Sequence, residues 1–202
     1  MSTSRTAGSP SPVKTIFAFD TATSHATCCL VRDGEAGDEV RTEAREVLRA
    51  ADELLRSAGL EPRELDGVVV GTGPGSFTGL RIGLATARGL ALGLDVPVAG
   101  ISTLNAFAGG RPVIDARRGE VFTDGPAVAR PGELEVNGLR LIGDGAVRYR
   151  QIFEANGADV PPDDDPAHLP VAGLLAALAE RFGPADDLEP LYVRLPDAKP
   201  SR

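Results

Sequence analysis

The sequence predicts an α/β fold, and residues 68–104 predict its central unit. Three consecutive valines at the start of this stretch are typical of a buried strand, and a glycine-rich loop follows them. The proline-free segment from about Phe77 to Leu92 favours a helix ended by Gly93, after which Val98-Ala99 indicates a second strand. Strand, loop, helix and strand form a βαβ unit, whose crossover is expected to be right-handed.

The residues before this unit predict a hairpin and a helix. Residues 16–20 indicate a first strand that closes on a carboxylate, and residues 26–31 indicate its antiparallel return. Residues 43–58 carry Ala, Val and Leu at helical spacing, with Leu48 on the apolar face. The first lobe of the fold is therefore expected to span residues 13–110.

The second half predicts a shortened copy of the first. A strand at residues 113–115 ends on an aspartate, as the first strand does, and residues 139–145 repeat the pattern of a strand followed by Gly-x-Gly. These two features lie closer together than their counterparts in the first half, so the second lobe, residues 111–198, is expected to be reduced. Residues 125–137 are rich in Pro, Gly and Glu and predict a loop, while residues 171–182 predict an amphipathic helix.

The composition describes an acidic protein. Lys and Arg number 21 against 29 Asp and Glu, which gives a net charge of −8, and no basic run is present. Such a chain is a poor nucleic-acid binder by itself, because phosphate contacts supply most non-specific affinity. No apolar run has the length of a membrane span, and residues 1–12 are rich in Ser and Pro, so we expect a disordered tail and a soluble, cytoplasmic protein. Adjacent Cys28 and Cys29 are expected to point to opposite faces of a strand and to stay reduced.

One face of the central helix carries small residues. They are Gly79, Gly83, Ala87 and Ala91, with Leu80 and Leu84 beside them. A repeat of four residues places the small residues in one row, and glycine inside a helix costs stability unless a close approach by another backbone requires it. That backbone belongs either to this chain, which is the commoner case, or to another subunit. We take the six residues as a candidate partner interface.

The glycine-rich loop before this helix is a candidate nucleotide or anion site. Gly73, Gly75 and Ser76 lie between a strand and a helix N-terminus, where backbone N–H groups and the helix dipole favour an anion. The loop has neither the lysine of a Walker A motif nor the third glycine of a dinucleotide fingerprint, and a tight turn is the alternative. Asp20 and Arg117 follow strands and are further candidate contacts, with turn capping and simple solvation as their alternatives.

No catalytic or metal site is predicted. His25 and His168 are the two histidines, and neither has carboxylates nearby at the spacing of metal ligands. A Gly-x-Ser-x-Gly elbow is absent from the sequence, and position suggests no Cys–His pair. The chain is therefore expected to act without catalytic residues of its own.

With these motifs the chain resembles the TsaB (YeaZ) family of bacterial subunits for tRNA threonylcarbamoyladenosine biosynthesis. The resemblance rests on FDTAT at residues 19–23, GTGPGSFTGLRIGLATARGLALGLDVPVAGISTL at residues 71–104 and IDARRGEVF at residues 114–122. IGDGA at residues 142–146 and PLYVRLPDA at residues 190–198 add support. The resemblance implies an actin-like (ASKHA) duplicated fold, in agreement with the internal repeat.

The resemblance also implies a function as the non-catalytic partner of TsaD. TsaD is the related subunit that transfers threonylcarbamoyl from an adenylate, made by TsaC, to adenosine beside the tRNA anticodon. The resemblance implies that the chain forms a heterodimer with TsaD and that a TsaE-like ATPase joins the complex. It further implies that tRNA binds only through this complex. Without TsaD, a homodimer is the candidate state of the chain. No cofactor of the chain itself is expected, with ATP or ADP and Mg²⁺ as candidates at the subunit interface.

Some positions depart from the family and from TsaD. TsaD-type proteins carry a metal-binding HxxxH pair, and the matching positions here are Thr103 and Phe107, which fits a partner role. Residues 35–42 are short for the family and residues 123–135 lack a strand pair, so the first lobe is expected to be nearly intact and the second reduced. The alternative function is an ATP-dependent phosphotransferase or ATPase, because actin-like folds often transfer or hydrolyse phosphate. A peptidase activity has no supporting nucleophile or metal motif.

Overall fold

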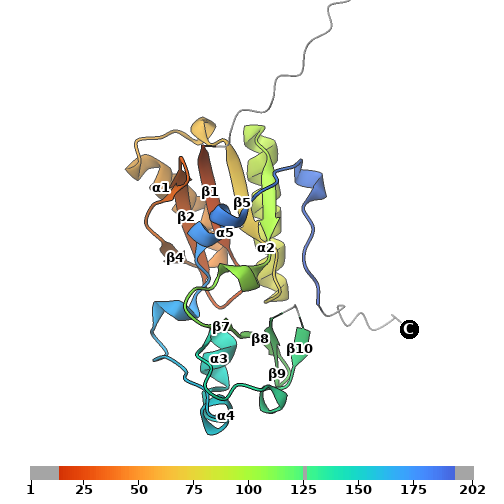
Figure 1. Ribbon diagram of the computed structural model, residues 1–202. Helices are drawn as coiled ribbons and strands as arrows, with labels where there is room; N and C mark the ends of the chain where they lie inside the picture. Colours follow the sequence, from red (N-terminus) through yellow and green to blue (C-terminus); the bar gives the residue numbers. More distant parts are fainter. Residues whose placement is uncertain (1–13, 125–126, 194–202) are drawn as a thin grey trace, which may run out of the picture.

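The computed structural model describes residues 14–124 and 127–193, and the tail expected at residues 1–12 lies outside them. Two lobes lie one above the other in the view of Figure 1, with β1, β2 and β5 in the upper lobe and β8, β9 and β10 in the lower one. The first lobe has one sheet and the second lobe has two smaller ones, and each lobe has its own apolar core. The space between the lobes is where the candidate site residues meet.

The first lobe is built on a mixed sheet. Its strands are β1 (Thr15–Asp20), β2 (Ala26–Arg32), β3 (Glu35–Ala36), β4 (Val40–Thr42), β5 (Gly67–Gly71) and β6 (Val98–Ile101). They are ordered β3-β2-β1-β5-β6, and β4 pairs with β2. β1 and β2 form the predicted antiparallel hairpin, and β5 pairs in parallel with both β1 and β6. The predicted strand–helix–strand unit is therefore confirmed.

Helices cover both faces of this sheet (Figure 1). The helices are α1 (Val47–Ser57) and α2 (Phe77–Leu94) on one face and α5 (Ala172–Leu178) on the other. The core under α1 and α2 contains Phe17, Phe19 and Cys28, whereas the core under α5 contains Ile16, Ala18 and Cys29. The strand alternation places the two cysteines on opposite faces, as predicted, and both are buried and free.

The position of α5 corrects the expected extent of the second lobe. We expected residues 111–198 to form that lobe, but α5 packs against β1 and β2 of the first sheet. The chain therefore returns to the first lobe after leaving the second. The helix also ends at Leu178 instead of residue 182, because the backbone then pairs with β6, with N–H···O bonds of 2.9 Å in both directions between Val98 and Gly183.

Two other helix boundaries differ from the expectation. α2 continues past Gly93 to Leu94, because Asp95 adopts a left-handed conformation (φ 54°) and donates its N–H to the carbonyl of Ala91. The first helix begins with a 3₁₀ turn, Ala44–Glu46, and α1 starts only at Val47. The tighter turn changes the rotation of the helix, so Leu48 is 55% exposed instead of facing the core.

The second lobe is smaller. Its elements are β7 (Arg111–Pro112), β8 (Ile114–Arg117), β9 (Glu120–Thr123), β10 (Ala127–Ala129), β11 (Leu141–Ile142), α3 (Asp144–Arg148) and α4 (Arg150–Ala155). β10, β9 and β8 form an antiparallel sheet, and β11 pairs in parallel with β7. The loop predicted for residues 125–137 is wrong at β10, because Ala127–Ala129 pair with β9 although only Val128 among them favours a strand.

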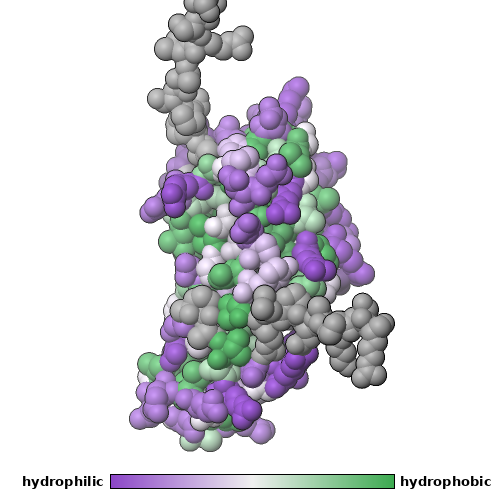
Figure 2. Space-filling model, turned by 90° about the vertical axis from the view of Figure 1, so that its right-hand side faces the viewer, coloured by the Kyte–Doolittle hydropathy of each residue, from purple (hydrophilic) through white to green (hydrophobic). Residues whose placement is uncertain are grey.

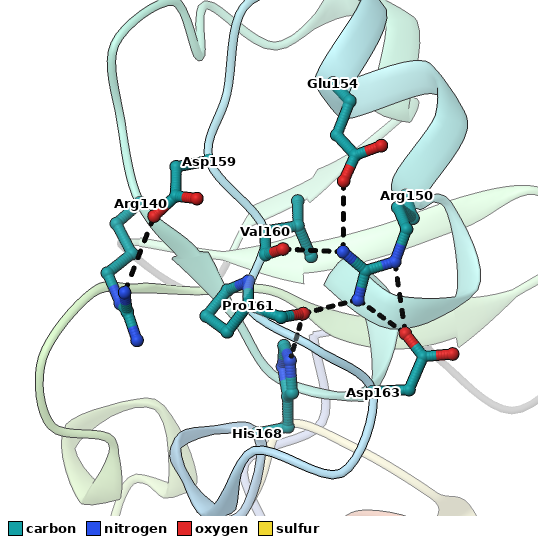
Figure 3. A network of polar contacts seen from close by, with 8 residues as sticks. All are labelled: Arg140, Arg150, Glu154, Asp159, Val160, Pro161, Asp163 and His168. Carbon is teal, nitrogen blue, oxygen red and sulfur yellow. Dashed lines mark hydrogen bonds and ion pairs between the residues drawn. The ribbon is translucent and has the colours of Figure 1, made fainter.

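A polar network on the second lobe holds the chain before α5 (Figure 3). The guanidinium of Arg150 donates to the carbonyls of Val160 and Pro161 and to the carboxylate of Asp163. Buried His168 accepts the N–H of Gly143 on Nδ1 at 3.1 Å, and its Nε2 lies 3.2 Å from the carbonyl oxygen of Pro161. Nε2 therefore carries the proton, and the ring connects two loops as a structural histidine.

Candidate functional site

The predicted small-residue row packs inside the first lobe. A Cβ added to Gly79 would lie 2.0 Å from the carbonyl oxygen of Thr21, and one added to Gly83 would lie 2.1 Å from the hydroxyl of Thr21. That hydroxyl donates to the carbonyl of Gly79 at 2.8 Å. The glycines are thus required because α2 crosses the turn after β1 at very short range.

This packing corrects the predicted partner interface. All six residues, Gly79, Leu80, Gly83, Leu84, Ala87 and Ala91, are buried by the chain itself. The row exists at the predicted spacing, but it faces the sheet and the β1–β2 turn of its own chain. The intramolecular alternative is the right one.

The opposite face of α2 carries a second row that sequence reasoning missed. Ala85, Gly89 and Gly93 recur every four residues and are exposed. A Cβ added to Gly89 or Gly93 would meet nothing within 4 Å, and the neighbouring Leu92 is 70% exposed. This outer row has the same spacing as the inner one, which is the signal that could have found it. We call Ala85, Gly89, Leu92 and Gly93 the outer face of α2.

Asp20 is part of a buried network beneath the glycine-rich loop. Its carboxylate accepts from the hydroxyl of Thr103 at 2.6 Å and from the N–H of Ala22 at 2.7 Å. Thr103 in turn accepts the N–H of Gly73 at 3.1 Å. Burial raises the pKa of Asp20 to about 6, although both hydrogen bonds oppose the shift. Asp20 and Gly73 therefore position the loop, and the carboxylate, which is fully buried, is not the predicted ligand contact.

The remaining predicted contacts meet at a cleft of about 630 Å³ between the lobes. We call it the arginine cleft; its walls include Gly75, Ser76, Phe77, Asp115, Arg117, Arg118, Phe122, Leu191 and Tyr192. Figure 2 shows the side of the molecule that carries α2 and β10, which is the right-hand side of Figure 1. Apolar residues of the lower lobe are visible on this surface. The structure thus brings Gly75 and Ser76 of one lobe close to Arg117 of the other.

The turn between β8 and β9 places Arg117 and Arg118 at the arginine cleft. Arg117 and Arg118 form the tight turn between β8 and β9 with φ of 63° and 58°, a conformation that is uncommon for residues other than glycine. The buried carboxylate of Asp115 accepts the N–H of Arg117 at 2.9 Å and lies 3.3 Å from its guanidinium. The Arg117 side chain is nevertheless 70% exposed, so its charge faces the cleft without full neutralisation.

Aromatic rings and a helix end complete the walls. The rings of Phe77 and Tyr192 lie 5.7 Å apart, and Leu191 is fixed by a 2.8 Å hydrogen bond from its N–H to the carbonyl of Thr72. Ser76 caps α2, because its hydroxyl accepts the N–H of Gly79 at 3.3 Å. The N–H of Ser76 is already donated to the carbonyl of Ala22, so a ligand would use the next N–H groups of the helix.

The two positions that match the TsaD HxxxH pair begin and directly follow a short 3₁₀ helix, Thr103–Ala106. Thr103 is buried in the Asp20 network, whereas Phe107 packs against a small apolar cluster that includes Ile114 and Phe122. Within residues 14–124 and 127–193, no group of three His, Cys, Asp or Glu side chains is arranged to hold a metal ion. Over the same ranges, no helix has both the length and the apolar character to cross a membrane.

The sequence is similar to a known protein family and to proteins from several bacteria. Residues 40–126 match the family model for TsaD, tRNA N6-adenosine threonylcarbamoyltransferase. An uncharacterized protein of Mycobacterium tuberculosis is 37% identical over 213 residues, which cover 93% of this chain and 95% of that protein. The Escherichia coli tRNA threonylcarbamoyladenosine biosynthesis protein TsaB is 36% identical over 121 residues, which cover 53% of this chain and 52% of that protein.

A solved structure extends the likeness to the whole fold. The structure of YeaZ from Pseudomonas aeruginosa superposes with a TM-score of 0.72 at 26% sequence identity, covering 89% of this chain and 99% of that chain. The predicted class, an α/β actin-like duplicated fold, is confirmed by this superposition and agrees with the sheets and helices described above.

Proposed function

The chain belongs to the TsaB (YeaZ) family, and from this membership we propose that it is the non-catalytic partner of a TsaD-type subunit that forms threonylcarbamoyladenosine in tRNA. Curated relatives from Escherichia coli, Haemophilus influenzae and Bacillus subtilis are named for tRNA threonylcarbamoyladenosine biosynthesis, which supports a role in that modification. Because the net charge is −8, the chain by itself is a poor binder of tRNA, and the complex as a whole would bind it. A TsaE-like ATPase is the proposed third member of that complex.

The outer face of α2 is the observation that carries the proposed pairing. The part of the chain that matches the TsaD family model, residues 40–126, includes α1, β5, α2 and β6. Two related chains can pair through equivalent helices about a pseudo-twofold axis. The outer glycines leave room for such a helix to approach closely, and exposed Leu92 supplies apolar area to bury. The same face would support a homodimer when TsaD is absent.

Gly89→Leu is expected to weaken this pairing and leave the monomer folded. A leucine at the contact would hold the two helices apart, and such overpacking costs about 1–3 kcal/mol, or roughly tenfold to a hundredfold in affinity. In the free chain the added side chain points into open space, and the helix gains up to about 1 kcal/mol from losing a glycine. Size-exclusion chromatography with the TsaD-like subunit and an assay of tRNA modification by the full mixture measure both effects.

The control variant introduces a leucine at a position outside the proposed contact. Gln151→Leu adds an exposed leucine to α4 of the second lobe, away from the proposed contact. It should leave complex formation and modification unchanged. Normal assembly by Gly89→Leu, or modification of tRNA by the purified chain alone, would contradict the proposed role.

The arginine cleft favours a second candidate function, binding of a nucleotide by an ATPase or phosphotransferase. The exposed Arg117 guanidinium, the N-terminus of α2 and the aromatic rings suit a phosphate and a base, with Mg²⁺ carried by the nucleotide. Arg117→Ala is expected to weaken binding of Mg-ATP about tenfold in calorimetry, whereas Arg63→Ala, which removes an exposed charge outside the cleft, should not. Equal binding by both variants would exclude this site, and ATP turnover by the purified chain would favour the second function.

A further inference from the structure

A second cleft of about 450 Å³ lies between the lobes, next to the β1–β2 turn. We call it the acidic cleft; its walls come from β2, β4, α3 and the loop at residues 163–171. The wall residues include Thr27, Glu39, Val40, Arg41, Asp144, Val147, Asp164, Leu169 and Val171. None of these residues was identified as a contact in the sequence, and none belongs to the arginine cleft.

A buried hydroxyl without a partner lies on this wall. Thr27 is 4% exposed, and its Oγ1 has no hydrogen-bond partner among the residues that the structure describes. In the β2–β4 ladder Thr27 is paired with Arg41, so the two side chains, and that of Glu39 two residues earlier, share one face of the sheet. An unsatisfied buried hydroxyl is costly, and a ligand that hydrogen-bonds it would remove the cost.

The charge of the cleft favours a cation. Asp163 is paired with Arg150 (Figure 3), and Asp165 lies 3.5 Å from a guanidinium nitrogen of Arg140. Glu39, Asp144 and Asp164 form no ion pair within residues 14–124 and 127–193. Arg41 is the one positive charge on the wall.

The groups around Arg41 and around the carboxylates of Glu39 and Asp144 also favour a bound cation. Arg41 donates to the ring of His25, whose pKa is lowered by burial and by Arg41, so the ring stays neutral. Burial raises the pKa of Glu39 and of Asp144. Glu39 accepts the N–H groups of Ala172 and Gly173, and Asp144 accepts the N–H of Asp115, but neither carboxylate has a positive partner in the part of the chain that the structure describes. A bound cation would supply the missing charge compensation.

We propose that the acidic cleft binds a small aliphatic amine. Its ammonium group would donate to the Thr27 hydroxyl and to the carboxylates of Glu39 and Asp144, which together supply enough acceptors for three N–H donors. The methylene chain would lie along Val40, Val147, Leu169 and Val171. A linear diamine fits best, because Asp164 at the exposed rim offers a partner for a second ammonium.

The test uses the full chain and putrescine as the probe in isothermal titration calorimetry. We expect one binding site per chain, and Thr27→Val and Asp164→Asn should each weaken binding about tenfold or more. Thr27→Val keeps the side-chain shape and removes an unpaired hydroxyl, so the fold should persist. Asp33→Asn removes one exposed carboxylate outside the cleft at a left-handed position that asparagine tolerates, and it should bind putrescine normally.

Two further probes separate a built site from general attraction to an acidic protein. 1,4-Butanediol has the same length without charge and should not bind. Binding of putrescine that is equal in Thr27→Val, Asp164→Asn and Asp33→Asn would overturn the proposal, as would no saturable binding to the unmodified chain. Because these measurements need no TsaD and no tRNA, their outcome is independent of the proposed function.

Discussion

Gly83→Leu is expected to destabilise the first lobe by about 3 kcal/mol or more, the largest effect of any single substitution considered. Even a Cβ at this position would lie 2.1 Å from the Thr21 hydroxyl, and the larger side chain would separate α2 from the β1–β2 turn. The hydrogen bond from Thr21 to Gly79 would be lost with it. For a chain of this size the melting temperature should fall by roughly 6–12 °C, measured by circular dichroism.

Gly89→Leu is the matched control for this prediction. The two glycines lie on opposite faces of one helix, and a Cβ at Gly89 meets nothing within 4 Å. Its melting temperature should therefore hold or rise, because a leucine stabilises the helix relative to glycine. Equal destabilisation by the two substitutions would mean that helix propensity, and not the contact with Thr21, determines the result.

The contribution of Asp20 to the free energy of unfolding is expected to fall by about 3 kcal/mol between about pH 3 and about pH 7, with about 2 kcal/mol of the fall between pH 4 and pH 6. Its pKa is about 6 in the folded chain against a model value of 3.8, mainly through burial. The folded state therefore binds the proton more tightly than the unfolded state. This stabilising contribution is fully present only below pH 3.8, and it is lost as the pH rises through about 6.

Asp20→Asn isolates this contribution. An asparagine can accept the N–H of Ala22 and donate to Thr103, and it does not titrate. The difference in free energy of unfolding between the two proteins, from urea titrations at pH 4 and pH 7, should shift in favour of the variant at the higher pH. A difference that is independent of pH would contradict the raised pKa.

The sequence predicted the elements of the first lobe because its local signals agree. The valine run of β5, the glycine-rich loop and the long apolar helix α2 each follow from neighbouring residues. The second half of the chain was harder to predict, because β10 depends on its pairing with β9, and the lobe to which α5 belongs depends on a sheet formed by residues more than a hundred positions earlier. The apolar periodicity of α5 predicts a helix, but it does not show which sheet the helix covers.

The candidate sites were predicted in part for the same reason. Spacing of four residues identified a row on α2, but two rows on that helix have this spacing, and the contact that distinguishes them is with Thr21, 58 residues away from Gly79. Arg117, Gly75 and Ser76 line one cleft, and their contact with a nucleotide or anion stays a prediction. Asp20 was chosen for its position after a strand, and its burial depends on Thr103 from another segment.

The adjacent cysteines allow the two layers of the first lobe to be observed separately. Cys28 lies under α1 and α2 and Cys29 lies under α5, and burial raises their pKa values to about 12 and about 11. Neither thiol is ionised at neutral pH in the closed protein, so a thiol-specific reagent reacts only when the covering helix moves away. Labelling rates of the two single-cysteine variants would thus report how often each side of one strand opens, and would show whether binding of a partner to α2 slows one side without the other.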